Sequence, residues 1–233
     1  MDQNEIKALT GKSAVEQLVK SGMKLGLGTG STALPAVRHL GLLLKEGKLS
    51  GIKAVSTSFQ TSMECEKWGI PLYTLNSGEI NGQLDLTIDG ADEIDERHWC
   101  TKGGGGALLV EKITAYASSA FCVVVDESKL VKNLGLTFPV PLEVIPEARR
   151  TVTLALEKLG ARVTLREALR KAGPVITEHG NLLLDLAFDG PADCAALETE
   201  FNRIPGVVEN GFFTRIRPVV FVGRSNGSVE VKQ

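Results

Sequence analysis

Residues 26–33 form the first of three segments whose residue types could do chemistry. They read GLGTGSTA and directly follow an apolar run. Glycines allow the backbone to approach a ligand closely, and N–H groups at a helix start and the hydroxyls of Thr29, Ser31 and Thr32 can donate to an anion. The segment, whose third glycine is Gly30, predicts a turn that binds a phosphate or a carboxylate. The alternative is a tight turn between strand and helix that holds no ligand.

This turn differs from the common nucleotide-binding loops. Its glycines follow the spacing G-x-G-x-G, and no G-K-[ST] follows them. The next predicted strand ends in Ser56, Thr57 and Ser58, where a dinucleotide-binding fold would place an acidic residue for the ribose. The sequence therefore indicates an anion site without a nucleotide fingerprint.

The second segment, residues 84–95, gathers carboxylates behind a strand. It reads LDLTIDGADEID: apolar residues alternate at its start, Asp89 ends the predicted strand and Gly90 turns the chain. Like charges crowded at a strand end raise the pKa of at least one carboxyl, which suits acid–base catalysis. The alternative is a solvated acidic turn in which Asp92 caps a helix. A calcium loop is excluded because Thr87 replaces an oxygen-rich ligand and the alternation makes the first half a strand.

The third segment, residues 101–113, reads TKGGGGALLVEKI. An ordered glycine costs up to about 1 kcal/mol relative to alanine, so close approach to a ligand explains four consecutive glycines better than packing does. Lys102 adds a positive charge. Glu111 falls on the predicted helix among apolar neighbours, which would raise its pKa toward the range of a general base. The alternative places Glu111 on the surface beside Lys112.

Outside these three segments, the sequence offers few candidates for catalytic or metal-binding residues. Lys129 follows the predicted strand at 121–127, and a lone lysine is more often solvated than functional. The three histidines are scattered without a metal-binding spacing, and no G-x-S-x-G elbow is present. We therefore expect neither a metal nor a cofactor. The histidines are His39, His98 and His179.

The elements that must position these residues alternate between strands and helices over residues 1–135. Apolar runs that predict strands lie between helical patterns, which is typical of βαβ units, a mostly parallel sheet, and ligands at the carboxyl ends of the strands. The expected class is α/β, with a Rossmann-like catalytic domain at 1–135. The predicted strands are MKLGLGTG (23–30), IKAVSTS (52–58), PLYTL (71–75), LDLTIDG (84–90) and FCVVVDE (121–127).

Residues 136–210 show a different order, β-α-β-β-α-β, which predicts a smaller ferredoxin-like α+β domain. The final stretch, 211–233, contains a short strand and a hairpin with a glycine turn, and is expected to return to the first domain. The predicted elements are PLEVI (141–145), a helix at 146–160, ARVTLRE (161–167), NLLLDLAFD (181–189), a helix at 191–206 and VVENGFF (207–213).

Composition excludes several classes of protein. The chain has 233 residues, 43% of them hydrophobic and 23% charged, close to globular averages of about 45–50% and 25%. The net charge of −2 lacks the basic excess of proteins that bind nucleic acids or anionic membranes. The start has no apolar signal region, and the cysteines have no zinc or disulfide spacing. We expect a cytoplasmic protein whose partners are small molecules, with no nucleic acid and no membrane.

Together these residues fit proton transfer next to a carbonyl of a phosphorylated small molecule. A carboxylate would remove a C–H proton, and a cation with backbone donors would stabilise the enediolate oxygen. Residue types and spacing alone do not identify the substrate.

The motifs resemble the type A ribose-5-phosphate isomerase family. The resemblance covers nearly the whole chain and is carried by GLGTGSTA, VSTS, DGADEID, KGGGGALLVEKI, DESKLV, PLEVIP and NRIPGVVENG, in that order. It implies an aldose–ketose isomerase that interconverts D-ribose 5-phosphate and D-ribulose 5-phosphate in the non-oxidative pentose phosphate pathway. It also implies a homodimer or homotetramer that needs no cofactor and no metal.

The resemblance assigns roles to individual residues. Glu111 matches the proton acceptor between C1 and C2, and Lys102 matches the stabiliser of enediolate charge. Asp89 and Asp92 match residues that bind sugar hydroxyls or assist ring opening, and Lys7 is a weaker match to a phosphate contact. The segments that match substrate-binding positions are Thr29, Gly30, Ser31 and Thr32; Asp89, Gly90, Ala91 and Asp92; Lys102, Gly103, Gly104 and Gly105; and Lys129.

Other functions remain possible on similar folds. Amino-sugar-phosphate deaminases and CoA transferases share such folds, and a CoA transferase uses a glutamate as a covalent nucleophile. The aspartate pair and Lys102 argue against both. A sugar-phosphate sensor without catalysis would typically carry a basic DNA-binding extension, which this sequence lacks.

Overall fold

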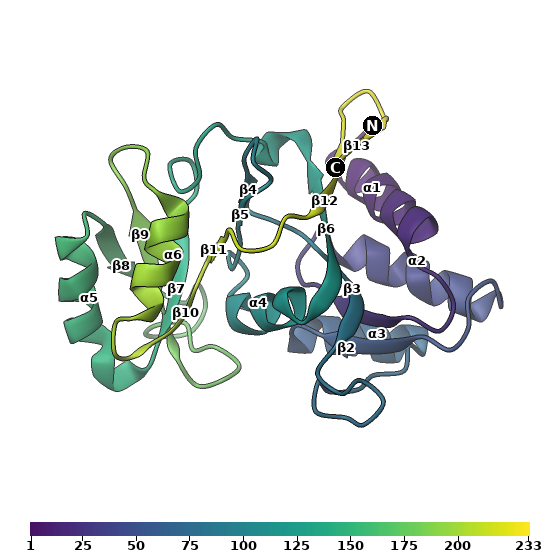
Figure 1. The fold of residues 1–233 in the computed structure, drawn as a ribbon, viewed down its shortest axis with the longest axis horizontal. Helices are drawn as coiled ribbons and strands as arrows, with labels where there is room; N and C mark the ends of the chain where they lie inside the picture. The colour runs from purple at the N-terminus through teal and green to yellow at the C-terminus, as the bar shows by residue number, and fades with distance from the viewer. The chain divides into compact units, whose positions relative to one another are not determined.

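The structure is a computed structural model that describes residues 1–233, and the chain forms two compact units (Figure 1). Unit 1 comprises residues 1–91, 110–129 and 216–233. Unit 2 comprises residues 92–109 and 130–215. Residues 92–109 thus belong to the same unit as residues 130–215, and the segment 110–129 between them belongs to unit 1.

Unit 1 is built on a six-stranded sheet in the order β13-β12-β6-β3-β1-β2, parallel except for β13. The two central strands are buried at residues 86–89 and 121–126 and are rich in Val, Leu and Ile, as expected for a sheet covered on both faces. The α/β class is confirmed. The strands are β1 (Lys24–Leu27), β2 (Lys53–Ser56), β3 (Leu84–Asp89), β6 (Ser118–Asp126), β12 (Val219–Gly223) and β13 (Val229–Lys232).

Two helices of unit 1 begin at side-chain caps. Asp2 forms a capping box with Glu5 at the start of α1 (Gln3–Leu18), and Ser58 caps α3 (Phe59–Trp68) by accepting from the Thr61 N–H. Between them lies α2 (Leu34–Lys45), with a proline in its first turn; α4 (Leu108–Tyr116) crosses the boundary between the units, and η1 spans Glu127–Lys129. No helix has both the length and the hydropathy needed to cross a bilayer.

The connection order places a topological switch point between β1 and β3. From β1 the chain proceeds to β2 on one side, whereas β3 pairs with β1 on the other side, in the register Leu27 to Ile88. In open α/β sheets, ligands bind at the carboxyl ends of strands at such a point. The turn after β1 and the end of β3 therefore occupy the expected ligand position in unit 1.

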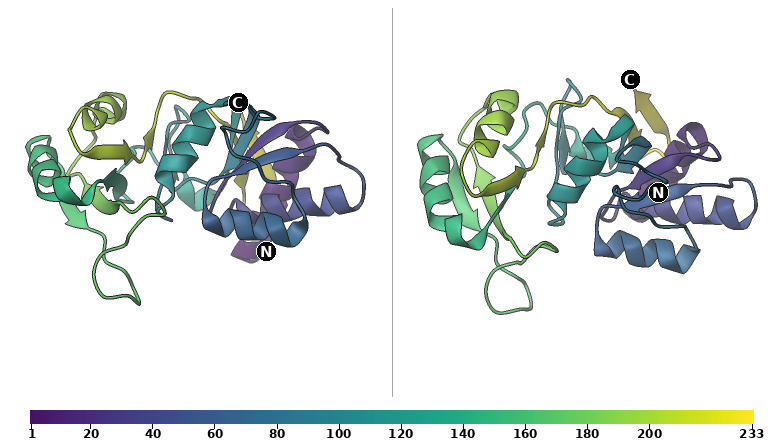
Figure 2. Two further views of the ribbon diagram at one scale, coloured as in Figure 1. Left: turned by 90° about the horizontal axis from the view of Figure 1, so that it is seen from below. Right: turned by 60° about the horizontal axis from the view of Figure 1, so that its bottom comes forward.

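Unit 2 contains an antiparallel sheet in the order β10-β7-β9-β8, together with α5 (Arg149–Lys158) and α6 (Cys194–Asn202). With the chain order β7-α5-β8-β9-α6-β10, this is the predicted ferredoxin-like arrangement. Figure 2 shows the long loop between β8 and β9 extending from this sheet. The strands are β7 (Val140–Val144), β8 (Arg162–Leu165), β9 (Leu182–Ala187) and β10 (Val207–Asn210); the short helix η2 spans Pro146–Ala148.

A second, three-stranded sheet in unit 2 was not predicted from periodicity. It has the order β11-β5-β4, from β11 (Phe212–Phe213), β5 (Cys100–Thr101) and β4 (Glu93–Ile94). Each strand is two residues long, which is too short for an alternating pattern to be visible. The predicted strand at 207–213 is accordingly divided into β10 and β11 at Gly211.

One predicted strand, PLYTL at 71–75, is wrong. Only a single parallel bridge between Leu72 and Ala54 forms there. The Tyr73 N–H donates to the Ala54 carbonyl at 2.8 Å, and the Ala54 N–H donates to the Pro71 carbonyl at 3.1 Å. Pro71 lacks an N–H and the chain turns after Thr74, so the pairing does not extend.

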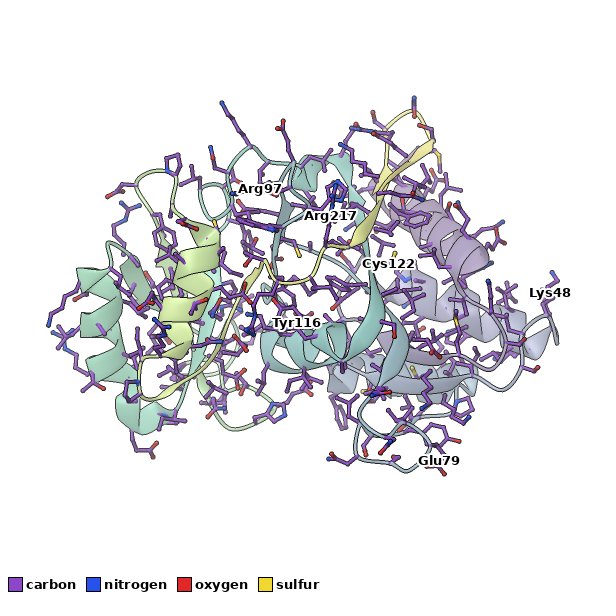
Figure 3. The ribbon with its side chains drawn as sticks, in the orientation of Figure 1. Lys48, Glu79, Arg97, Tyr116, Cys122 and Arg217 are labelled. Atoms are coloured by element: carbon purple, nitrogen blue, oxygen red, sulfur yellow. The ribbon has the colours of Figure 1, made fainter.

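Three buried thiols should be unreactive while the protein is folded. Burial raises the pKa of Cys65 to about 12 and that of Cys194 to about 11, and it raises the pKa of Cys122 on β6 (Figure 3) as well. Since the thiolate is the reactive form, we expect these thiols not to react with Ellman's reagent at pH 8 until guanidinium unfolds the chain.

The raised pKa values of these thiols also make the stability of the folded protein depend on pH. The folded thiols keep their protons to a higher pH than unfolded thiols, whose pKa is about 8.5, so stability should fall as the pH rises above that value. Rapid labelling of these three cysteines in the native state, located by mass spectrometry, would contradict the buried placement.

Candidate active site

Hydroxyl groups converge on the turn after β1. The Oγ1 atom of Thr29 lies 2.7 Å from Thr57 Oγ1, 2.6 Å from Ser58 Oγ and 3.2 Å from Thr61 Oγ1. Thr61 Oγ1 in turn donates to the Gly28 carbonyl at 2.7 Å. Hydrogen bonds from the end of β2 and the start of α3 therefore fix this turn, in addition to any packing.

The outer part of this turn carries a cation and a side-chain amide. Lys7 Nζ donates to Ser31 Oγ at 2.9 Å, and the Gly30 N–H donates to Gln60 Oε1 at 3.2 Å. Thr32 is half-buried and Ser31 is exposed. The turn thus offers hydroxyl, amide and ammonium donors, the groups that bind a phosphate.

Asp89 is attached to the same turn. Its side chain is fully buried, and Oδ1 accepts hydrogen bonds from the N–H groups of Thr29 at 3.0 Å and Gly90 at 2.7 Å. A Cβ atom added to Gly28 would lie 2.0 Å from this oxygen, so only glycine lets the carboxylate approach the turn. The predicted anion turn and the predicted acidic residue meet at the switch point of unit 1.

Glu111 lies on α4 and is buried, with 5% of its surface exposed. The neighbouring Lys112 is also buried, with its Nζ atom 6.0 Å from the ring centroid of Tyr116. The alternative that places Glu111 on the surface beside Lys112 is therefore wrong. A carboxylate removed from bulk water has the setting that a general base requires.

Lys129 ends η1 and is half-buried near Asp126. Burial by itself would raise the pKa of Asp126, but hydrogen bonds from Ser128 and Gln3 and the charge of Lys129 outweigh it, and the net shift is downward. Asp126 therefore stays ionised at the carboxyl end of β6, where its charge and that of Lys129 attract each other.

In unit 2, Asp92 binds the glycine segment. Its Oδ2 accepts a hydrogen bond from the Gly104 N–H at 2.7 Å, and its own N–H donates to the Thr101 carbonyl at 2.8 Å. A Cβ atom on Gly104 would lie 2.5 Å from Asp92 Oδ1. Asp92 precedes β4 and not a helix, so the helix-cap alternative is wrong. Gly90 and Ala91 form the connection that leads into Asp92.

Lys102 follows β5 and is buried, with 2% of its surface exposed. Its backbone N–H donates to the Gly211 carbonyl at 2.9 Å, and its Nζ atom lies 5.6 Å from the ring centroid of Phe213. The segment then turns: the Gly106 N–H donates to the Gly103 carbonyl at 2.9 Å, and Gly105 is exposed. Within unit 2, the structure places Asp92, Lys102 and the glycine segment on one short hairpin.

Two further acidic residues of the second segment, Glu93 and Asp95, serve the fold. Glu93 Oε1 accepts from the N–H groups of Thr137 at 3.0 Å and Phe138 at 2.8 Å, and its Oε2 accepts from Gly135 at 2.6 Å. At the turn between β4 and β5, the Asp95 carboxylate accepts hydrogen bonds from the backbone N–H and the guanidinium of Arg97, which is labelled in Figure 3. The expected crowding of carboxylates therefore does not extend to Glu93 and Asp95, each of which has its own donors.

We predict that Glu93→Ala destabilises unit 2. Glu93 is 1% exposed, and its removal strands three backbone N–H groups and the hydroxyls of Thr137 and Thr101. Unsatisfied buried donors cost about 1–3 kcal/mol each, with partial relaxation, so we expect a loss of ~3–5 kcal/mol. The melting temperature should fall by about 6–20 °C in a thermal scan. The exposed Glu147→Ala is the control, and equal melting temperatures for the two variants would refute the anchoring role.

Several residues of these sites have no local sequence signal. Gln60, Thr61 and Glu93 act through partners that lie 30 or more residues away in the sequence. Arg166, on the segment after β8, donates to the carbonyls of Gly103 and Gly104. Side chains of this kind are found only when the tertiary fold brings distant segments together. No three His, Cys, Asp or Glu side chains of the described chain are grouped so that they could hold a metal ion.

Each unit holds its own set of groups that could act on a sugar phosphate. Unit 1 holds an anion-binding turn with a buried aspartate and, on α4, a buried glutamate; unit 2 holds a lysine beside an aspartate and backbone amides. A phosphorylated sugar offers an anion, hydroxyl groups and an acidic C–H next to a carbonyl, and each has a counterpart among these residues.

Comparison with known proteins agrees with this chemistry. Residues 53–227 match the family model for ribose 5-phosphate isomerase A (phosphoriboisomerase A). Ribose-5-phosphate isomerase A of Treponema denticola is 52% identical over 237 residues, which cover 99% of each chain. The Treponema pallidum protein of the same name is 48% identical, covering 99% of this chain and 93% of its own.

Solved structures agree over the full length. Ribose 5-phosphate isomerase A from Methanocaldococcus jannaschii superimposes with a TM-score of 0.92 at 44% identity, and a D-ribose-5-phosphate isomerase in complex with phospho-erythronic acid superimposes with a TM-score of 0.94 at 39% identity. Both alignments cover 100% of both chains. The sequence motifs, the fold and these relatives together show that the chain belongs to the ribose-5-phosphate isomerase A family.

Proposed function

We propose that the protein interconverts D-ribose 5-phosphate and D-ribulose 5-phosphate, a step of the non-oxidative pentose phosphate pathway. The observation that carries this proposal is the contact of Asp89 with the hydroxyl-lined turn after β1. It joins a phosphate-binding turn to a buried acidic group at the switch point of the sheet. Membership of the isomerase family supports the same reaction.

The proposed roles follow the chemistry of each residue. Glu111 carries the proton, and Lys102 stabilises the negative charge that develops on the substrate oxygen. Asp89 and Asp92 bind sugar hydroxyls or assist ring opening, and Lys7 contacts the phosphate. The remaining substrate-binding residues are Thr29, Gly30, Ser31, Thr32, Gly90, Ala91, Gly103, Gly104, Gly105 and Lys129.

The reaction itself is a proton transfer. Glu111 removes the proton from C2 of the open-chain aldose, and the electron pair of that bond forms the C1–C2 double bond of an enediolate whose charge rests on O1. The same carboxyl group returns the proton to C1, and the proton of the C2 hydroxyl passes to O1 as C2 becomes a carbonyl. Lys102 and glycine N–H groups lower the barrier by stabilising the oxyanion.

An assay in deuterated water tests this function. The purified protein is incubated with ribose 5-phosphate, with and without EDTA, and the ketose is followed by its absorbance and by NMR. We expect ketose formation with solvent deuterium at C1, because a carboxyl that carries a proton exchanges with solvent. Failure to produce ketose from ribose 5-phosphate would reject the proposed function, and inhibition by EDTA would reject a mechanism without a metal.

We predict that Thr32→Ala weakens substrate binding more than turnover. The hydroxyl of Thr32 belongs to the anion-binding turn, and a phosphate distant from the reacting carbons is bound almost equally in the ground and transition states. We expect KM to rise by about 10- to 150-fold, since one hydrogen bond to a charged group contributes about 1.5–3 kcal/mol, while kcat changes less than about twofold. The exposed Thr199→Ala on α6 is the control. A loss confined to kcat would contradict the role.

We also infer that the protein works in the cytoplasm as a homodimer or homotetramer. The four cysteines are buried thiols, which suits a reducing compartment. Sedimentation at micromolar concentration tests the oligomeric state, and a monomer would reject it.

A further inference from the structure

Arg166 contacts the glycine segment of unit 2 from the strand region after β8. Its Nη1 atom donates to the carbonyl of Gly103 at 3.1 Å and to that of Gly104 at 3.0 Å. The other side of the guanidinium forms a bidentate pair with Asp185 on β9: Nε lies 2.9 Å from Oδ2 and Nη2 lies 2.5 Å from Oδ1. The side chains of Arg166 and Asp185 are only 17% and 20% exposed.

In a trans peptide group the N–H points in the direction opposite to the carbonyl, and this applies to both carbonyls that Arg166 binds. The Gly103 carbonyl shares a peptide plane with the Gly104 N–H, and the Gly104 carbonyl shares one with the Gly105 N–H. A charged donor on the oxygen polarises the peptide group and strengthens its N–H as a donor. The Gly104 N–H donates to Asp92 Oδ2 at 2.7 Å, so a continuous hydrogen-bonded chain runs from Asp185 through Arg166 to Asp92.

Glycines 103–105 need such an external support. They have no side chains that could pack, and glycine has the largest conformational freedom of all residues. A single arrangement of their N–H groups therefore depends on contacts made to the backbone itself. Arg166 is suited to this task because its planar fork binds two carbonyls and both oxygens of a carboxylate at once, four acceptors in fixed directions, whereas a lysine ammonium has only three donors.

We propose that Arg166, oriented by Asp185, is a positioning residue for catalysis: it fixes and polarises the peptide groups of Gly103 and Gly104 and thereby the orientation of Asp92. The inference rests on the proposed function, in which Asp92 and the glycine N–H groups contact the substrate. Its main consequence is a contribution that grows as negative charge develops on the substrate oxygen, so it acts on kcat more than on KM.

The experiment compares two variants with a matched control. Arg166→Lys keeps the charge but loses the fork, and Asp185→Asn keeps the shape but loses the charge that orients the guanidinium. Arg162→Lys is the control, because Arg162 lies nearby on β8 and pairs with Asp189 while its side chain is 65% exposed. Each protein is assayed for kcat, KM, melting temperature and inhibition by phospho-erythronic acid, whose carboxylate stands in for the charged enediolate oxygens.

We expect Arg166→Lys to lower kcat by about 10- to 100-fold and Asp185→Asn by about 3- to 30-fold, the range for loss of a positioning contact. KM should change less than about threefold, and the inhibition constant of phospho-erythronic acid should rise by a factor similar to the loss in kcat. Arg162→Lys should match the wild type in all four measurements.

Several results would overturn the inference. Wild-type kcat and inhibition in Arg166→Lys would do so, as would a rise in KM alone, which would indicate uniform substrate binding. A loss of activity that merely follows a loss of folded protein in both variants would assign the pair a structural role. A wild-type protein without isomerase activity would reject the proposed function itself, whereas an active wild type with an unaffected Arg166→Lys would reject only this inference.

Discussion

Glu111→Gln is expected to lower kcat by about 10²- to 10⁴-fold, the range for loss of a general base. Glutamine has nearly the same shape as glutamate but cannot accept and return a proton at neutral pH. Because Glu111 is buried, a water molecule is poorly placed to act as the base in its stead. The Michaelis constant should change by less than about threefold, because the carboxyl acts on the reacting carbons and not on the phosphate.

Two further measurements make this prediction specific. Exchange of the C2 proton of ribose 5-phosphate with deuterated solvent should fall by the same factor as kcat, since both require proton removal. Glu157→Gln, an exposed position near the end of α5, is the control and should keep wild-type activity. A kcat within twofold of the wild type in Glu111→Gln would exclude Glu111 as the base.

Lys102→Met is expected to have the second-largest effect, a decrease in kcat of about 10²- to 10³-fold, comparable to removal of one oxyanion donor. Methionine retains the apolar length that packs near Phe213 but carries no charge. The enediolate oxygen then loses a cation at the moment its charge develops, whereas the neutral carbonyl of the substrate loses less.

The readout of this variant differs from that of Glu111→Gln. Inhibition by phospho-erythronic acid should weaken markedly in Lys102→Met, because a carboxylate needs the same cation, while Glu111→Gln should bind this inhibitor as well as the wild type or better. Lys158→Met, at the end of α5, serves as the control. Undiminished inhibition of Lys102→Met would remove Lys102 from the oxyanion site.

Local patterns were sufficient for most elements of the fold. Alternating apolar residues predicted β3, and the buried run at 121–127 predicted β6, because a strand within a covered sheet needs apolar side chains on both faces. The order of elements at 136–210 predicted the ferredoxin-like sheet, since few topologies connect β-α-β-β-α-β without crossing. The two-residue strands β4, β5 and β11 and the single bridge at Leu72 lie below the length at which periodicity is informative.

The sequence by itself determined which residue types stand at the ends of strands. The hydroxyls after β1, the aspartate that ends β3 and the glycines after Lys102 are visible as local motifs, because turns and helix starts have their own residue preferences. Only the tertiary structure decided what each side chain binds. Asp89 joins the turn at Thr29, Glu93 instead anchors residues 135–138, and Arg166 reaches back 63 residues to Gly103. Such partners depend on sheet order and packing between distant segments, and no periodicity along the chain encodes them.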